Sequence, residues 1–218
     1  MCGIAGFIDF NKKSNSEVLA KMSCVIPHRG PDGQGVYFKQ EVEAHVGLGH
    51  RRLSIIDLSH AADQPMHYNS LHVIFNGEIY NYIEIRDRLI SLGHTFQTHS
   101  DTEVILHSWQ QWGEEAIRQW RGMFSIVLFD EAKRQLTFIR DRAGVKPFYY
   151  YWKDGLFLFA SELKSITAHP EFKKEVDPNA VASFLQYGYI SHPHCIYSDT
   201  YKLPPGHLLQ LNLKTKGT

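Results

Sequence analysis

The sequence predicts a mixed α and β fold, because helical and extended apolar patterns follow one another along its 218 residues. In the first half, apolar side chains recur every three or four positions in several segments, which indicates amphipathic helices. From residue 123 onward, short runs that are apolar or alternate in polarity dominate, which indicates strands. This length fits one large domain or two small ones.

The first predicted strand follows Cys2 directly. Its side chains alternate between two faces, with Ile4, Ile8 and Phe10 on one face and Ala5, Phe7 and Asp9 on the other. If Met1 is removed, Cys2 carries both a thiol and a free α-amino group, whose ordinary pKa is about 8. Such an amine can act as the base for its own thiol, as in N-terminal nucleophiles. A free cysteine at a frayed chain end is the alternative interpretation.

A helix, a loop and further strands are predicted next. Residues 16–26 have helical spacing, and residues 28–33 form a turn-rich loop. Two short strands follow, at residues 35–38 and 44–48. A buried strand at 71–75 then ends at Asn76-Gly77-Glu78, where the Asn-Gly pair taken alone fits a hairpin turn.

Two helices follow this strand. Apolar residues spaced 3, 4 and 3 apart predict an amphipathic helix over 82–92, which Gly93 ends. Ser100 and Glu103 fit a capping box, in which Ser100 caps the next helix and Glu103 reaches back to the Ser100 backbone N–H. Asp101 would lie in the first turn of that helix, where the helix dipole favours its charged form.

The rest of the chain is predicted to be rich in strands. They are expected at residues 123–129, 136–140, 148–152, 156–160 and 209–213. Lys153-Asp154-Gly155 joins two of these strands and is a strong hairpin signal. Two helices are predicted between the strands, at residues 161–168 and 178–187.

Charge and cysteine content exclude several classes of protein. The chain has 23 basic and 23 acidic residues and no basic block, so neither a nucleic acid nor an acidic membrane is expected as a partner. No apolar run reaches transmembrane length, and no signal peptide is recognisable. Three widely spaced cysteines, Cys2, Cys24 and Cys195, favour a reducing, cytoplasmic location.

The thirteen histidines raise the question of a metal site. The densest cluster is His192-Pro193-His194-Cys195. A zinc site usually pairs such a group with a second one at helical or hairpin spacing. No second group is evident in the sequence, so we expect no metal and interpret these histidines as solvated loop residues.

Seven short motifs occur in order along the chain. They are Cys2-Gly3-Ile4-Ala5-Gly6, His28-Arg29-Gly30-Pro31-Asp32-Gly33, Arg52-Leu53-Ser54-Ile55-Ile56-Asp57, Asn76-Gly77-Glu78-Ile79-Tyr80-Asn81, Ser100-Asp101-Thr102-Glu103-Val104, Arg140-Asp141-Arg142-Ala143-Gly144-Val145-Lys146-Pro147 and Ser161-Glu162-Leu163-Lys164. The ordered set closely resembles the glutaminase domain of glutamine-hydrolysing asparagine synthetases, which are class II glutamine amidotransferases. The resemblance runs from Cys2 to about Leu213.

The resemblance implies a fold that spacing alone does not. It is the α+β fold of N-terminal-nucleophile hydrolases, a four-layer αββα sandwich. The resemblance also implies a glutamine amidotransferase type 2 domain over residues 2–213. Residues of about 190–218 would lead into an ATP-dependent synthetase domain, whose Ser-Gly-Gly-x-Asp-Ser loop is absent from this sequence. We therefore expect the sequence to be part of a longer protein.

Chemical roles for individual residues also follow from the resemblance. Cys2 would attack the side-chain amide of L-glutamine, giving a glutamyl thioester and ammonia. The Asn76 side chain and the Gly77 backbone N–H would bind the oxyanion. Arg52 would bind the α-carboxylate of glutamine and Asp101 its ammonium group. In isolation, Arg52 would be interpreted as a surface charge and Asp101 as an ordinary helix-start acid.

The remaining expectations concern the pocket wall, cofactors and partners. Further groups expected to line the pocket are the backbones of Leu53, Ser54, Ile55, Ile56 and Glu78, and the loop 28–33 would shape one wall. No cofactor is expected for the glutaminase step, and ATP and Mg are expected only in the synthetase domain. The partners implied are L-glutamine and that domain, and a homodimer is allowed.

Three functions are compatible with these observations. The preferred one supplies ammonia for ATP-dependent amidation of aspartate to asparagine. A class II amidotransferase domain that serves a different acceptor is the second. The third is a non-catalytic domain of the same fold, which would be expected to lose Cys2, Asn76 or Asp101.

Overall fold

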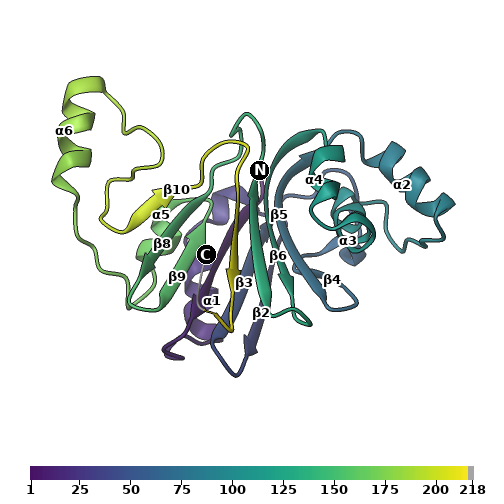
Figure 1. The fold of residues 1–218 in the computed structure, drawn as a ribbon, viewed down its shortest axis with the longest axis horizontal. Coiled ribbons are helices and arrows are strands. Elements are labelled where there is room, and N and C mark those ends of the chain that lie inside the picture. Colours follow the sequence, from purple (N-terminus) through teal and green to yellow (C-terminus); the bar gives the residue numbers. More distant parts are fainter. Residues whose placement is uncertain (216–218) are drawn as a thin grey trace.

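Two antiparallel β-sheets stack against each other in the computed structural model, which describes residues 1–215 (Figure 1). Sheet A has six strands in the order β10-β8-β9-β1-β3-β2, and sheet B has five in the order β11-β7-β6-β5-β4. The strands of sheet A are β1 (Gly3–Asp9), β2 (Gly33–Gln40), β3 (His45–Arg52), β8 (Tyr149–Lys153), β9 (Leu156–Ala160) and β10 (Thr200–Lys202). Those of sheet B are β4 (Met66–Tyr68), β5 (Leu71–Ile79), β6 (Gly122–Asp130), β7 (Gln135–Arg140) and β11 (Leu208–Asn212). Residues 216–218, which belong to the segment expected to lead into a further domain, lie outside the described residues.

Helices cover the outer faces of both sheets. They are α1 (Ser16–Cys24), α2 (Tyr82–Ser91), α3 (Asp101–Trp112), α4 (Glu115–Gln119) and α5 (Leu163–Thr167). A further helix, α6 (Pro178–Tyr187), and two short 3₁₀ turns, η1 (Pro27–Arg29) and η2 (His60–Ala62), complete the helical elements. Helix α1 ends at Cys24 and not at Ile26 as predicted, because Pro27 disfavours helical geometry in the residue before it. The short elements β4, β10 and α4 were not predicted.

The alternation predicted for the first strand is confirmed by the side on which each residue packs. Ile4 and Ile8 of β1 lie in the apolar layer between the sheets, together with Val127 of sheet B. Phe7 points the other way and packs in a cluster with Leu19 of α1. Both faces of β1 are therefore buried, which fixes its register strongly.

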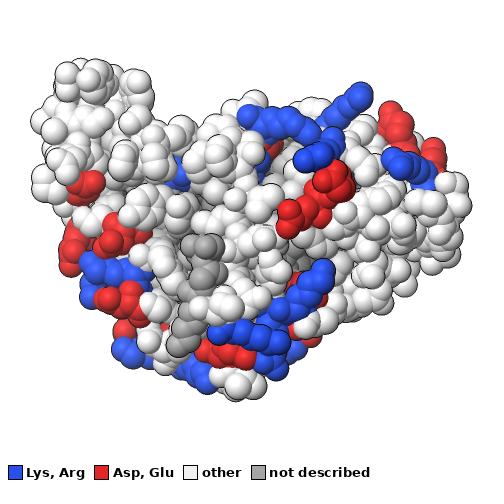
Figure 2. Space-filling model, viewed as in Figure 1, with Lys and Arg blue, Asp and Glu red and all other residues white. Residues whose placement is uncertain are grey.

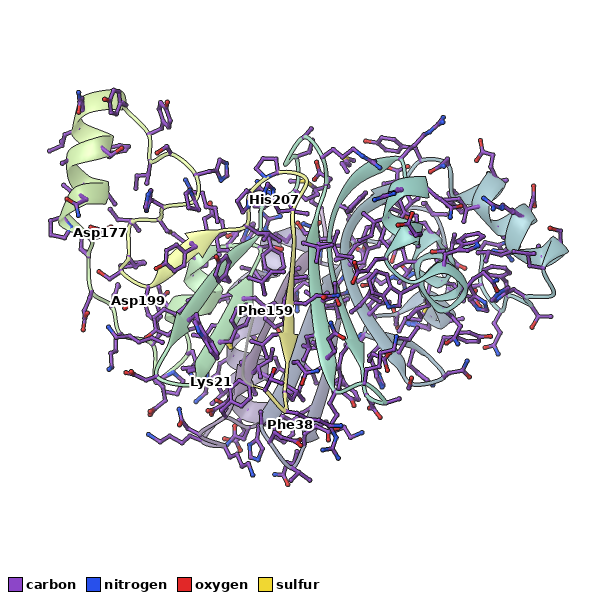
Figure 3. All side chains as sticks on the ribbon, viewed as in Figure 1. Lys21, Phe38, Phe159, Asp177, Asp199 and His207 are labelled. Carbon is purple, nitrogen blue, oxygen red and sulfur yellow. The ribbon has the colours of Figure 1, made fainter. Side chains whose placement is uncertain are left out.

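Three apolar clusters fill the spaces between four layers. One joins α1 and α5 to sheet A, and another joins α2 and α3 to sheet B. The third lies between the sheets and includes Phe159 of β9, which is labelled in Figure 3. The ring centroid of Phe159 is 5.2 Å from that of Phe138 in β7. This arrangement confirms the predicted αββα sandwich.

Strand β5 is longer than predicted. It pairs with β6 from Leu71 to Ile79, with Asn76 opposite Ser125 and Gly77 opposite Phe124. Asn76 and Gly77 therefore lie within the strand, and the hairpin-turn interpretation is wrong. The long partner β6 extends the ladder, which satisfies the backbone groups of this segment.

The start of α3 differs in one respect from the predicted capping box. Ser100 does cap the helix, since its hydroxyl accepts a hydrogen bond from the Glu103 N–H at 3.3 Å. The Glu103 carboxylate does not return to the Ser100 N–H but accepts from the N–H groups of Gln97 and Thr98, at 2.8 and 2.7 Å. The Ser100 N–H instead donates to the Thr98 hydroxyl at 3.2 Å. The turn before the helix thus supplies the partners that the capping box was expected to supply.

The predicted hairpin at Lys153-Asp154-Gly155 is confirmed. It joins β8 to β9, and both Asp154 and Gly155 have positive φ, at 50° and 77°. Positive φ at both central residues is the requirement of a type I′ turn, which asparagine, aspartate and glycine meet best.

Helix α6 projects from the body of the sandwich (Figure 1). Its N-cap is Asp177, which lies at the base of this projection (Figure 3). The segment 178–191 contains no charged residue, and the projection is accordingly white above its base in Figure 2. Several of its apolar side chains are exposed, including those of Phe184, Leu185 and Tyr187.

Candidate active site

A cavity of about 130 Å³ lies where the start of β1, the end of β3, the end of β5 and the start of α3 meet. The structure brings all the residues that the sequence analysis assigned to the site to its walls. They are Cys2, Arg52, Leu53, Ser54, Ile55, Ile56, Asn76, Gly77, Glu78 and Asp101. Because β1 and β3 belong to sheet A and β5 to sheet B, the stacking of the two sheets creates the cavity.

The Cys2 thiol is held at one wall of the cavity by the backbone of Leu53. Its Sγ donates to the Leu53 carbonyl at 3.5 Å and accepts from the Leu53 N–H at 3.4 Å. Burial raises the pKa of the Cys2 thiol above its usual value, so the group is neutral near pH 7. Met1 precedes it, and while Met1 is present the nitrogen of Cys2 is a peptide nitrogen without basic character. Reaction through this sulfur therefore requires a base, which removal of Met1 would create.

Asn76 presents an unusual side-chain amide at the cavity. The residue is 1% exposed, and neither Oδ1 nor Nδ2 has a hydrogen-bond partner among the described residues. A buried amide without partners costs free energy of about 1–3 kcal/mol. Such a group calls for an explanation, and a site that binds a polar ligand supplies one.

Gly77 brings the backbone close to the neighbouring strand. A Cβ atom at this position would come within 2.1 Å of the Met123 carbonyl oxygen and 2.6 Å of the Phe124 Cα. Glycine is therefore required by the approach of β5 to β6. Its backbone lies at the cavity directly after Asn76, so both residues can present an N–H donor to one small group.

The Arg52 guanidinium lies across the end of β3 and is largely buried. It donates to the Asp63 carboxylate, to the Ser59 carbonyl at 2.9 Å and to the Asp57 carbonyl at 2.5 Å. These contacts use both protons of one terminal nitrogen and one proton of the other. The Nε proton and one terminal proton have no partner among the described residues, which leaves two donors for a carboxylate.

Asp101 is the acidic residue of the opposite wall. Its carboxylate accepts a hydrogen bond from the Ile79 N–H at 3.0 Å, and the residue is 6% exposed. Burial raises the pKa of Asp101 to about 6, and the nearby Glu78 adds to the rise. An ammonium group bound beside it would replace the missing solvation and favour the charged form.

The loop 28–33 does not line the cavity, contrary to expectation, but two of its residues support the wall from behind. Asp32 accepts a hydrogen bond from the Ser54 N–H at 2.8 Å. Arg29 donates to the Cys2 carbonyl at 3.5 Å and to Glu162 at 2.5 Å. The loop thus contacts residues of the wall without lining the cavity itself.

No group of three or more His, Cys, Asp or Glu side chains within residues 1–215 could hold a metal ion. In the same part of the chain, no helix is long and apolar enough to cross a membrane.

Comparison with known proteins identifies the family. A family model described as a glutamine amidotransferase domain matches residues 1–218. The chain belongs to the glutamine amidotransferase family. Asparagine synthetase [glutamine-hydrolyzing] 3 of Bacillus subtilis is 37% identical over 216 residues, which cover 96% of this chain and 34% of that protein. Amidase chry2 of Gibberella zeae is 36% identical over 225 residues, covering 96% of this chain and 32% of that protein.

Solved structures agree on the fold of this amidotransferase domain. Glutamine phosphoribosylpyrophosphate amidotransferase from Bacillus subtilis, complexed with ADP and GMP, superimposes with a TM-score of 0.71 at 18% identity. The match covers 97% of this chain and 47% of that one. The chain spans about a third of the length of the two curated relatives above.

Some residues that line the cavity of the amidotransferase domain were not singled out from the sequence. The side-chain oxygen of Gln64, Oε1, accepts from the Phe75 N–H at 2.6 Å, and the side-chain nitrogen Nε2 donates to the Thr102 hydroxyl at 3.2 Å. Gln64 therefore connects β5 to α3 beside the site, but it lies in a polar loop with no pattern to mark it. Lys146 also lines the cavity. It belongs to a motif that the sequence analysis recognised without assigning it a role.

Proposed function

We propose that this domain hydrolyses L-glutamine to glutamate and ammonia, with Cys2 as the nucleophile after removal of Met1. The observation that carries the proposal is the unpartnered Asn76 amide, which lies in the wall of the same cavity as the Cys2 thiol. A donor held free in advance is what an oxyanion site requires, because no reorganisation is then needed during reaction.

In the first half of the reaction, the α-amino group of Cys2 accepts the thiol proton, and Sγ attacks the side-chain carbonyl carbon of glutamine. The carbonyl oxygen becomes an oxyanion, which accepts hydrogen bonds from the Asn76 amide and the Gly77 N–H. The carbon–nitrogen bond then breaks, and the α-ammonium group returns its proton to the leaving nitrogen. Ammonia leaves, and a glutamyl thioester remains on Cys2.

In the second half, water replaces ammonia. The α-amino group takes a proton from the water as its oxygen attacks the thioester carbon, and the same two donors bind the second oxyanion. The carbon–sulfur bond breaks, the sulfur recovers a proton, and glutamate is released. The same donors serve both halves because the two tetrahedral intermediates place their oxyanion in the same position.

The two ends of free glutamine that do not react need partners of opposite charge. The two free donors of Arg52 suit the α-carboxylate. The Asp101 carboxylate suits the α-ammonium group. Backbone groups of the segment 53–56 and of Glu78 complete the pocket, and the glutaminase step uses no cofactor.

The ammonia acceptor is proposed to be aspartate, activated by ATP and Mg in a synthetase domain that follows this one in the full protein. The names of relatives such as the Bacillus subtilis asparagine synthetase support this assignment. A different acceptor is the second candidate, favoured by the similarity to Amidase chry2.

The presence of Cys2, Asn76 and Asp101 argues against a non-catalytic domain. Three cysteines without disulfides fit a cytoplasmic location.

The test is to incubate the chain, proven by mass to start at Cys2, with glutamine, aspartate and Mg-ATP. We expect glutamate, but neither asparagine nor pyrophosphate, because no nucleotide-binding motif occurs in the sequence. Cys2→Ala should abolish glutamate release while the protein stays folded. Asn76→Ala should lower kcat about 100- to 1000-fold with a smaller effect on KM. No glutamate from the correctly processed chain would favour the non-catalytic alternative.

A further inference from the structure

The loop between β7 and β8 holds the backbone of Lys146 from both sides. The Lys146 N–H donates to the Asp141 carboxylate at 2.9 Å, and its carbonyl accepts from the Arg140 Nε at 2.8 Å. Asp141 also accepts from the N–H groups of Ala143 and Val145, at 3.1 and 2.9 Å. These buried contacts fix the direction in which the Lys146 side chain leaves the loop.

The Lys146 side chain is a buried amine that has no acidic partner, and burial lowers its pKa below the usual value of lysine. The residue is 3% exposed and lines the cavity together with Cys2. Within the described part of the chain its ammonium group makes one hydrogen bond, to the Met1 sulfur at 3.2 Å. A thioether is a weak acceptor. Removal of Met1 would take away this acceptor and leave the ammonium group in the cavity that Cys2 also lines.

The other two cations near Cys2 are neutralised by carboxylates. Arg29 forms an ion pair with Glu162 at 2.5 Å, and Arg52 forms one with Asp63. Lys146 has no such pair among residues 1–215. A buried charge without a counterion is costly, so a position that retains one indicates a use for the charge.

Three acidic groups near Cys2 and Lys146 have the opposite effect to a positive charge, because a negative charge favours the ammonium form of an amine and disfavours a thiolate. They are Asp101 from α3, Glu78 from β5 and Asp141 from the loop itself. Asp141 is occupied by backbone donors, and burial keeps Asp101 partly protonated below neutral pH. Of the three positive charges near Cys2, that of Lys146 is therefore the one that carboxylates neutralise least.

We propose that Lys146 is a positioning residue whose charge keeps the α-amino group of the processed Cys2 neutral and its thiol ready to lose a proton. This inference rests on the proposed function. Lys146 gives up no proton in the step, since the thiol proton moves from Sγ to the α-amino nitrogen. A nearby positive charge disfavours an ammonium group and favours a thiolate. Both effects bring the N-terminus into its reactive protonation state at a lower pH.

The test compares Lys146→Met and Lys146→Arg with the parent chain, all proven by mass to start at Cys2. The first measurement is the rate at which iodoacetamide alkylates Cys2 at each pH, without glutamine. Peptide mapping separates Cys2 from the exposed Cys24. The second is the pH profile of kcat/KM for glutamine. Lys133→Met is the control, because Lys133 is exposed and lies in the turn after β6, outside the cavity lining.

Loss of the charge should raise the midpoint of the alkylation profile by about 0.5 to 1 pH unit and slow alkylation at pH 7 by about 3- to 10-fold. The acidic limb of kcat/KM should move in the same direction. Lys146→Arg should restore most of both effects, and Lys133→Met should have neither. A profile that falls in height with an unmoved midpoint would assign Lys146 a purely structural role and overturn the proposal.

Two further arrangements keep this test decisive. Lys146→Gln replaces Lys146→Met if thermal unfolding reveals a misfolded variant. The alkylation profile does not depend on glutamine turnover. A shifted midpoint in a chain that hydrolyses no glutamine would therefore support the role of the charge while contradicting the proposed function.

Discussion

At the scale of single residues, the candidate site contains groups that reduce the stability of the empty domain. Asp101 is the clearest case, because burial raises its pKa to about 6 from an ordinary value below 4. Between these two values the folded chain binds more protons at Asp101 than the unfolded chain does. The contribution of Asp101 to the free energy of unfolding therefore falls as pH rises from below 4 to about 6, and the loss is complete above about pH 6. A difference of about two pKa units corresponds to roughly 3 kcal/mol.

We predict that Asp101→Asn raises the free energy of unfolding at pH 7 by about 1–3 kcal/mol, because asparagine can accept the Ile79 N–H without a buried charge. At pH 4 the two proteins should be equally stable, since Asp101 is then protonated. The KM for glutamine should rise at least about tenfold, because the ammonium group loses its counterion. Urea unfolding at both pH values and glutamine kinetics measure these effects.

Asp57→Asn provides a control that should change the free energy of unfolding at pH 7 in the opposite direction. Hydrogen bonds from Ser59 and from the His99 N–H lower the pKa of Asp57 to about 2, so its charge stabilises the fold above the ordinary pKa. This variant should be less stable than the parent at pH 7. If Asp101→Asn were also destabilised at pH 7 and unchanged in KM, Asp101 would be an ordinary helix-start acid.

At the scale of elements, the segment 53–63 closes one side of the cavity and is organised around Arg52. The guanidinium holds the carbonyl groups of Asp57 and Ser59 and the side chain of Asp63. Asp63 is about half exposed, so the ion pair contributes little to global stability. Its main effect is to orient the two remaining donors of Arg52.

We therefore predict that Asp63→Asn changes the free energy of unfolding by less than about 1 kcal/mol but raises the KM for glutamine about 3- to 10-fold. The turnover number should change less, because the role proposed for Arg52 is to bind a part of glutamine that does not react. Asp154→Asn is a matched control, since it removes an exposed ion pair with Lys173 at a hairpin outside the cavity lining. If the two variants changed KM equally, the orientation of Arg52 by Asp63 would have no role in glutamine binding.

Elements with strong local signals could be predicted from the sequence, and those defined by partners could not. Helix α6 has the bounds predicted for it because Asp177, Pro178 and Gly188 mark its two ends. The end of β5 was misplaced, because Asn76-Gly77 is a turn signal that pairing with the long strand β6 overrides. Strands β4 and β10 have three residues each and depend wholly on their neighbours.

The same distinction applies to the site. The cavity residues that carry family motifs could be predicted, because each motif places them in order along the chain. Gln64 and Asp63 were not foreseen, because their partners Phe75, Thr102 and Arg52 become neighbours only through the folded arrangement. The approach of Lys146 to Met1 spans 145 positions in sequence and could not be derived from periodicity.

At the scale of the whole molecule, the proposed glutamine hydrolysis requires the two sheets to keep a fixed relative position, because Cys2 directly precedes β1 of sheet A and Asn76 lies in β5 of sheet B. The apolar layer between the sheets supplies most of this constraint. A polar cluster adds to it near the ends of the strands remote from the cavity. There Glu131, beside sheet B, accepts hydrogen bonds from Tyr37 and Lys39 of β2 in sheet A, the latter at 2.6 Å.

We predict that Glu131→Gln lowers the free energy of unfolding at pH 7 by about 1–2 kcal/mol, because the hydrogen bonds between the sheets lose their charged acceptor. Burial alone would raise the pKa of Glu131, but the hydrogen bonds from Lys39 and Tyr37 outweigh it and lower the pKa. The stabilisation is therefore present above the ordinary pKa of glutamate and is lost as pH falls through the lowered value. Urea unfolding between pH 3 and 7 should show the difference between variant and parent shrinking toward acid pH.

The kcat/KM for glutamine at 25 °C should change less than about twofold, since the apolar layer still aligns Cys2 with Asn76. A large loss of kcat/KM with unchanged stability would mean that this cluster, and not the apolar layer, sets the relative position of the sheets at the cavity.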